Sequence, residues 1–210
     1  MADRAAPGTR RRPGRPSDRT DVREAILVAA LNQLVDAGGP ERVTIASVVA
    51  EAGCTPPSLY HYWPTRELLL HEASLRGWAQ FRADQAAAVT EEDDPLMRLR
   101  KRGRAYLDFA LARPALFRVL FLSPGAVDHD QPATPGEGQA LVDLVADVQE
   151  AMARGLLRAE DPFVTALALW STMHGVAALW AVDRRHPPEL AHAVAALAQD
   201  AVLTGLAQQR

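Results

Sequence analysis

The chain has 210 residues, 48% of them hydrophobic, a net charge of −3 and one cysteine, Cys54. This length allows one large domain, or a small domain beside a larger one, with a sizeable core. A single cysteine excludes an internal disulfide framework and fits a reducing cytoplasm. We expect no membrane span and no secretory signal, because the arginine-rich N-terminus lacks a following apolar stretch.

The N-terminal part is the basic part of the chain. Residues 1–66 carry 9 Arg against 7 Asp and Glu, whereas the remainder carries 14 basic against 19 acidic residues. Residues 1–19 hold six arginines, three prolines and two glycines, which predicts a disordered basic arm. Arg15 lies in a Gly-Arg-Pro sequence similar to that of minor-groove AT-hooks. Salt-dependent attraction to phosphates, or a solubilising tail without contacts, are the alternatives.

The first predicted helix lies between Asp21 and Gly38. Asp21 and Glu24 form a plausible capping pair, and Gly38-Gly39 ends the helix. One helical face is apolar and predicts burial against a core. It consists of Ile26, Leu27, Ala30, Leu31 and Leu34.

Two short helices follow, separated by a glycine. Thr44 is a good N-cap for the first, and Gly53 supplies a sharp turn. Thr55 can cap the second, with Pro56 at its first position. Leu59 and Trp63 would point inward together and leave Ser58, His61 and Tyr62 outside. This arrangement predicts a helix-turn-helix whose second helix suits the major groove.

The same segment resembles the DNA-binding domain of the tetracycline-repressor (TetR) family of bacterial regulators. The resemblance rests on Thr44, Ala52-Gly53, the run from Leu59 to Trp63, and Arg66-Glu67-Leu68-Leu69; Val49, Tyr62 and Trp63 depart from the commonest pattern. It implies a homodimer bound to a double-stranded DNA operator. The positions that match family contacts are Thr44, Thr55, Pro57, Ser58, Tyr60, His61, Tyr62 and Arg66. Because the second helix lacks Arg, Asn and Gln, specificity would depend on shape, apolar contacts and water.

The rest of the chain keeps a helical pattern. A helix from Thr65 to about Ala88 would connect the head to the body, with Leu68, Leu69, Leu75, Trp78 and Phe81 facing inward. Further helices are expected over 96–112, 114–122, 137–154, 161–183 and 186–207, with a long loop at 123–136. The prediction is an all-α protein of about nine helices. Residues 20–66 would form the DNA-binding domain and residues 67–210 a helical regulatory and dimerisation domain.

The run from Trp170 to Gly175 resembles the W-x-x-x-H-G (WHG) arrangement of one regulatory-domain subgroup of that family. Aromatic residues nearby are numerous enough to line an apolar ligand pocket. The predicted lining is Trp78, Tyr106, Phe109, Phe117, Phe121, Trp170, Met173 and His174. The alternative is that these residues simply form core. We expect His174 to be a hydrogen-bonding core residue, and we expect no metal and no cofactor.

The last two helices are rich in alanine and leucine on more than one face, which predicts the dimer interface. The leading hypothesis is a cytoplasmic repressor that a small apolar or aromatic effector releases from its operator. A ligand-independent regulator or an activator is the alternative. A helical enzyme with a vestigial head is a third possibility, against which stands the lack of a recognisable catalytic motif.

Overall fold

The computed structural model describes residues 19–91, 93–122, 138–183 and 185–207, and within them the chain folds into nine α-helices without a strand. They are α1 (Arg19–Ala37), α2 (Ile45–Ala52), α3 (Pro56–Tyr62), α4 (Arg66–Ala87), α5 (Pro95–Ala112), α6 (Pro114–Phe117), α7 (Gln139–Ala153), α8 (Pro162–Val182) and α9 (Pro188–Leu206). A 3₁₀ turn, η1 (Pro40–Arg42), and a π-helical turn, η2 (Arg118–Leu122), complete the described elements. The predicted all-α fold is confirmed. The predicted arm with Arg15 and the 123–136 loop lie outside the described residues.

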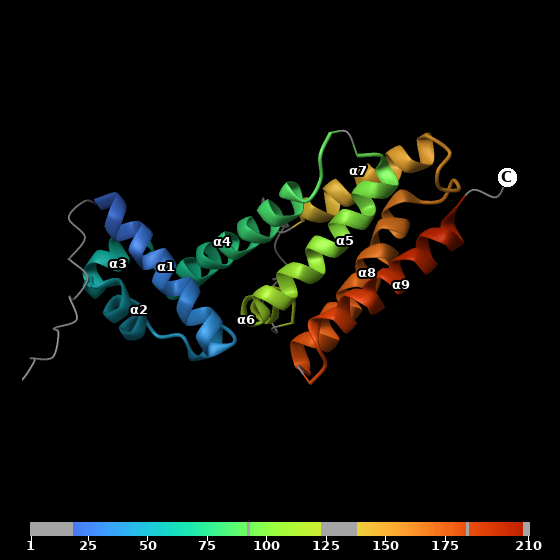
Figure 1. Ribbon diagram of the computed structural model, residues 1–210. Coiled ribbons are helices and arrows are strands. Elements are labelled where there is room, and N and C mark those ends of the chain that lie inside the picture. The colour runs from blue at the N-terminus through green and yellow to red at the C-terminus, as the bar shows by residue number, and fades with distance from the viewer. Residues whose placement is uncertain (1–18, 92, 123–137, 184, 208–210) are drawn as a thin grey trace, which may run out of the picture.

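The helices form a small head and a larger body (Figure 1). α1, α2 and α3 gather at one end, and α5, α7, α8 and α9 run side by side at the other, with α4 extending between the two groups. The apolar face predicted for the first helix is buried, since Ile26 is 0% and Leu34 is 1% exposed.

Local capping explains why the head folds as the sequence predicts. The Thr44 hydroxyl accepts a hydrogen bond from the Ser47 amide at 3.1 Å, and the Ser47 hydroxyl accepts one from the Thr44 amide at 3.3 Å. This reciprocal pair starts α2. Gly53 ends it in the left-handed region, at φ +67, where a side chain would be strained. Thr55 does not cap α3 with its side chain; its hydroxyl lies 3.0 Å from that of Ser58.

Two details of the predicted helices were wrong. Leu68 is 51% exposed, whereas Leu70 is buried beside Leu69. Leu68 lies in the first turn of α4, on the face that α1 does not cover. Asp21 and Glu24, predicted as a capping pair, lie inside α1, which begins at Arg19. Glu24 pairs with Arg76 of α4, and this hydrogen bond lowers the pKa of the Glu24 carboxyl.

A second set of contacts also fastens α4 to the head. Glu72 accepts a hydrogen bond from the Trp63 indole nitrogen at 2.5 Å and pairs with Arg23 of α1. The Arg23 guanidinium lies 5.2 Å from the centre of the Trp63 ring, within range of a cation–π interaction. The Glu72 carboxylate of α4 therefore joins Trp63, which follows α3, to Arg23 of α1.

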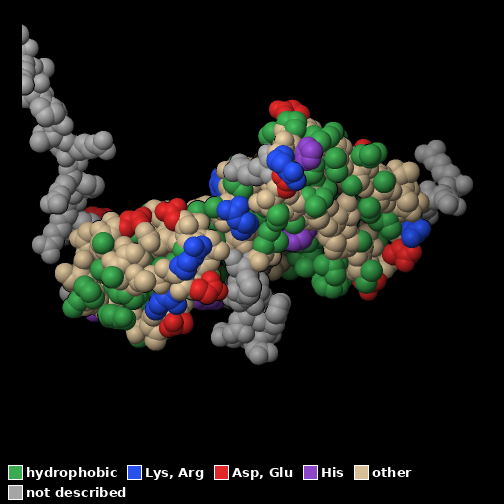
Figure 2. Space-filling model, turned by 90° about the horizontal axis from the view of Figure 1, so that it is seen from below, with side chains coloured by type: hydrophobic (Ala, Val, Ile, Leu, Met, Phe, Trp, Pro, Cys, Tyr) green, Lys and Arg blue, Asp and Glu red, His purple; other side chains and the backbone are tan. Residues whose placement is uncertain are grey.

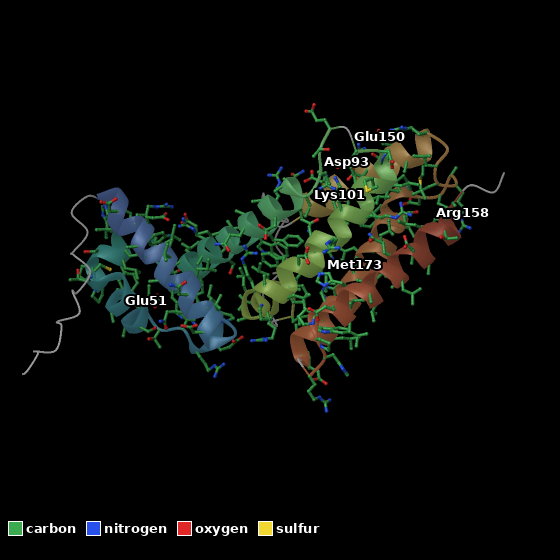
Figure 3. The ribbon with its side chains drawn as sticks, viewed as in Figure 1. Glu51, Asp93, Lys101, Glu150, Arg158 and Met173 are labelled. Carbon is green, nitrogen blue, oxygen red and sulfur yellow. The ribbon has the colours of Figure 1, made fainter. Side chains whose placement is uncertain are left out.

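The body contains a buried ion network between α5 and α7. The Asp147 carboxylate forms ion pairs with Nε of Arg98 at 2.7 Å and with Nε of Arg102 at 2.5 Å, and its side chain is only 8% exposed. Arg98 also pairs with Glu150, which Figure 3 labels on α7. On the other side of α5, the Gln199 amide of α9 donates to the Leu99 carbonyl at 2.8 Å. It lies against Gly103, where an added Cβ would come within 2.3 Å of Gln199 Nε2.

The sequence predicted no segment long and apolar enough to span a membrane, but α8 meets both criteria. It is 21 residues long and apolar enough to cross a bilayer by length and composition. Only 33% of its most apolar stretch is buried inside the chain. Its apolar side chains include exposed Val164, Leu179 and Val182, so this helix has a face that the described residues leave uncovered.

Asp147→Ala should lower the free energy of unfolding by about 3 kcal/mol, because the largely buried Arg102 guanidinium would lose the carboxylate that pairs with it and Arg98 would keep only Glu150. The measurement is chemical denaturation followed by circular dichroism. Asp200→Ala is the control: it removes a carboxylate from an exposed pair with Arg100 and should cost less than about 1 kcal/mol. Equal losses in the two variants would contradict the assignment of Asp147 as a buried counterion.

Candidate nucleic-acid interface and aromatic core

α3 presents polar and aromatic groups on its outer face. Leu59 and Trp63, which are 0% and 3% exposed, anchor its inner side as predicted. Tyr60 is 47% exposed, and His61 next to it is also exposed. The candidate positions Thr44, Thr55 and Pro57 are exposed, whereas Ser58, Tyr62 and Arg66 are half-buried. The helix therefore has an accessible surface that its own core does not need.

The acidic charge in this region is held away from that surface. Between Thr44 and Arg66 the one acidic residue is Glu51, at the end of α2 (Figure 3). Its carboxylate accepts hydrogen bonds from Asn32 at 2.8 Å and Gln33 at 2.6 Å, both on α1. The outer face of α3 carries no carboxylate that would repel a phosphate.

Tyr62 and Cys54 pack toward the inside of the head. The Tyr62 ring lies between its neighbours, 5.0 Å from the His61 ring centre and 5.7 Å from that of Trp63. Cys54 is half-buried, and burial raises the pKa of its thiol. This environment suits the small apolar role expected for that cysteine.

Arg66 is bound to the backbone in front of α2. Its Nε donates to the Val43 carbonyl at 2.9 Å, and its Nη2 donates to the Pro40 carbonyl. A hydrogen bond from Arg66 thus holds the start of α2 against the start of α4. Sequence reasoning did not find this role, since no short-range pattern relates position 66 to positions 40 and 43. A DNA contact by Arg66 stays a prediction.

In the body, most of the predicted pocket residues meet in one aromatic cluster. We use this name for the rings of Trp78, Phe81, Tyr106, Phe109, Phe117, Phe121, Trp170 and His174. Phe81, predicted only as a core residue, lies near its centre, 5.3 Å from Tyr106 and 5.1 Å from Phe109. The contacts are mostly edge-to-face, the geometry that aromatic pairs prefer. The rings therefore pack as a solid core.

Tyr106 and His174 form a polar pair within this cluster. The Tyr106 hydroxyl lies 2.8 Å from His174 Nδ1. Burial raises the pKa of Tyr106 and lowers that of His174, so both side chains are neutral near pH 7. His174 is thus a hydrogen-bonding core residue, as predicted. No group of three His, Cys, Asp or Glu side chains that could hold a metal lies within the described part of the chain.

The body contains a small cavity beside the aromatic cluster. Its volume is about 20 Å³, room for about one water molecule. Three predicted pocket residues, Tyr106, Trp170 and Met173, line it. The other predicted residues, Trp78, Phe109, Phe117, Phe121 and His174, are not part of its wall. A polar part of the wall, made of Gln85, Arg102 and Gln199, was not predicted, because the sequence argument considered only aromatic surface.

Comparison with known protein families covers both parts of the fold. Residues 26–73 match the family of bacterial regulatory proteins named tetR, and residues 99–205 match the tetracyclin repressor-like C-terminal domain. Neither match separates the WHG subgroup, which stays a prediction.

Two curated relatives are similar over part of their length. The HTH-type transcriptional regulator YobS of Bacillus subtilis is 27% identical over 108 residues, covering 50% of this chain and 55% of that protein. The nucleoid occlusion factor SlmA of Haemophilus influenzae is 26% identical over 163 residues, covering 78% of this chain and 66% of that protein. The chain thus spans between half and two thirds of the length of these relatives.

Solved structures share the whole architecture. A protein of unknown function from Rhodococcus sp. RHA1 superposes with a TM-score of 0.72 at 26% identity, covering 89% of this chain and 96% of that one. A bacterial regulatory protein of the tetR family from Rhodococcus RHA1 gives a TM-score of 0.69 at 19% identity, covering 90% and 98%. With its two family matches, this chain belongs to the TetR family of transcriptional regulators and has a DNA-binding N-terminal domain.

Proposed function

We propose that the protein is a cytoplasmic, homodimeric repressor that binds a pseudo-palindromic DNA operator and leaves it when a small apolar or aromatic effector binds. The observation that carries the proposal is the two-sided α3, anchored by Leu59 and Trp63 and exposing Tyr60 and His61. TetR-family regulators bind DNA operators and small-molecule effectors and form dimers. The family generally regulates rather than catalyses, and we propose no enzymatic activity for this member.

The outer face of the head supports phosphate contacts more than base contacts. Tyr60, Ser58 and Thr55 offer hydroxyl groups, which position a protein on the duplex by binding phosphates. Pro57 and His61 are left to contact base edges or thymine methyl groups, whereas Tyr62 is half-buried against the core of the head and offers only its exposed edge. Since α3 lacks Arg, Asn and Gln, operator choice would depend on DNA shape as well as on these contacts.

The uncovered face of α8 and α9 supports the proposed dimer. Its apolar members are 36–80% exposed: Phe163, Val164, Leu167, Leu179, Val182, Leu190, Val194 and Leu197. Figure 2 shows hydrophobic side chains spread over the helical body of the molecule. Pairing α8 and α9 with their copies would bury this surface. It would also give the twofold symmetry that a palindromic operator matches, with recognition helices about 34–36 Å apart.

One observation favours a second candidate, a regulator without an effector. The cavity of about 20 Å³ is far smaller than the pockets of several hundred Å³ that hold drug-sized ligands. An effector bound among these rings would therefore have to rearrange the aromatic cluster, whereas a larger space of about 180 Å³ lies elsewhere in the body, between α5 and α9.

Tyr60→Phe should weaken binding to operator and non-operator duplexes alike, by about 1 kcal/mol, because a phosphate hydrogen bond is lost. The protein's stability should not change, since the Tyr60 ring is 47% exposed.

Arg66→Ala should weaken DNA binding and also lower the melting temperature, because Arg66 donates to the carbonyl groups of Val43 and Pro40. Fluorescence-anisotropy titration at fixed salt and thermal denaturation measure both; unchanged affinity in Tyr60→Phe would remove Tyr60 from the interface.

Leu197→Glu should raise the dimer dissociation constant by about a hundredfold or more, because an unpaired charge would have to be buried between α9 helices. Leu197 is 74% exposed in the single chain, so the monomer should stay folded. Val142→Glu is the matched control, since Val142 is 57% exposed but lies on α7. Light scattering should find a monomer only for Leu197→Glu. A dimeric Leu197→Glu protein would place the interface elsewhere.

Trp170→Ala should abolish release from DNA by an aromatic compound that releases the wild-type protein, while ligand-free DNA binding stays within about twofold. Trp170 lines the cavity and packs 5.2 Å from the Tyr106 ring, far from the head. Mobility-shift titration beside light scattering tests both the release and the dimer. A variant that responds normally, or a ligand that dissociates the dimer, would contradict the proposed switch.

A further inference from the structure

Phe121 is half-buried and contacts most of the rings in the aromatic cluster. Its ring centre lies 4.7 Å from Trp78, 5.2 Å from Phe81 and 4.8 Å from Phe117. It also lies 5.5 Å from Tyr106 and 5.9 Å from His174, the two members of the polar pair. No other member of the cluster touches so many of its rings among the described contacts.

Phe121 comes from an unusual piece of backbone. It belongs to η2, the π-helical turn Arg118–Leu122 that continues α6. π-Helical turns are rare and occur frequently at functional sites. The Phe121 ring is therefore carried by a kind of turn that is typical of functional sites and not by one of the long regular helices around it.

Next to Phe121 lies a buried donor without an acceptor. The indole nitrogen of Trp78 is buried and donates to nothing within the described residues, although Trp78 is only 4% exposed. The Phe121 ring meets the Trp78 ring edge to face, at 71°, and offers at best a weak N–H···π contact. A buried N–H in this position is normally satisfied, so the site lacks one hydrogen-bond acceptor.

We propose that Phe121 occupies the effector site of the free protein, and that a planar aromatic molecule with a hydrogen-bond acceptor replaces it, placing that acceptor on Trp78 Nε1. This inference rests on the proposed function for the statement that the occupant is an effector. Tyr106 and Trp170 line both the cluster and the small cavity, so the space that Phe121 leaves adjoins the cavity of about 20 Å³. The space left by Phe121 and the adjoining cavity would together hold a ligand that is too large for either space alone.

The same turn contacts the helix that carries the head. A Cβ added at Gly77 of α4 would lie 3.0 Å from Leu116 of α6 and 3.1 Å from Leu120 of η2. The side chains of these two leucines therefore pack closely against the α4 backbone at Gly77, one residue before Trp78. Leu120 precedes Phe121 in η2, so a change of the η2 backbone that withdraws the Phe121 ring also changes the contact of Leu120 with α4. Displacement of Phe121 thus changes the packing of the helix whose first turn follows α3.

The experiment measures binding to the full-length protein by calorimetry, without DNA. Two probes of similar size are compared: acetophenone, which carries a carbonyl acceptor, and ethylbenzene, which does not. Phe121→Ala should bind acetophenone about tenfold or more tightly than the wild type, because no side chain competes for the site. Adding Trp78→Phe should lower the affinity for acetophenone relative to ethylbenzene by about fivefold, the effect of one hydrogen bond.

Phe109→Ala is the matched control. Phe109 belongs to the same cluster and is buried, at 1% exposure, whereas Phe121 is half-buried. The Phe109 ring packs on Phe81 and Arg113 rather than on Trp78. If Phe121→Ala does not fold by circular dichroism, Phe121→Leu takes its place and should show the same order of affinities. Equal acetophenone binding by the Phe109 and Phe121 variants, or a preference that survives Trp78→Phe, would overturn the proposal. A wild-type protein that binds acetophenone as expected but stays on its operator would contradict only the proposed function.

Discussion

The structure depends on α4 being one continuous helix that serves two cores. Its 22 residues extend about 33 Å. Near its start, Glu72 and Arg76 bind Arg23 and Glu24 of α1, so the head cannot rotate about α4 without breaking ion pairs. Farther along, Trp78 and Phe81 enter the aromatic cluster of the body. A change of packing in the core of the head or of the body therefore acts on the other core through the rigid helix α4 and not through a flexible linker.

The body combines two kinds of packing with different tolerance for change. α5 is held to α7 by the Asp147 ion network and to α9 by Gln199, which fits against Gly103 without spare room. Breaking a largely buried ion pair leaves an unpaired charge inside the protein, which is costly. The contacts of Phe121 with its neighbours involve no charge, and an aromatic ligand can reproduce them. Rearrangement should thus begin at η2 and leave α5, α7 and α9 in place.

Sequence reasoning located the elements well because their signals are local. Thr44 and Gly53 begin and end α2 through their own backbone geometry, and Leu59 and Trp63 are buried because i and i+4 share a face. It failed where a residue's role depends on a distant partner. Arg66 binds carbonyls at positions 40 and 43, and Leu68 is exposed while Leu70 is buried, because the approach of α1 and not periodicity alone decides which face of α4 is covered.

The candidate site was predicted in its composition and not in its shape. Aromatic residues from α4, α5, η2 and α8 do come together, yet the sequence could not say whether they enclose space or fill it. That depends on rotamers and helix spacing, and here the rings fill it. The polar wall of Gln85, Arg102 and Gln199 was missed because it arises from three separate helices.

The Tyr106–His174 pair has a consequence for the charge inside the aromatic cluster. Burial keeps both groups uncharged at neutral pH and resists protonation of the imidazole as the pH falls below its usual titration range. This pair therefore adds no charge to the aromatic cluster near neutral pH, and its hydrogen bond withstands a modest fall in pH without protonation of the imidazole.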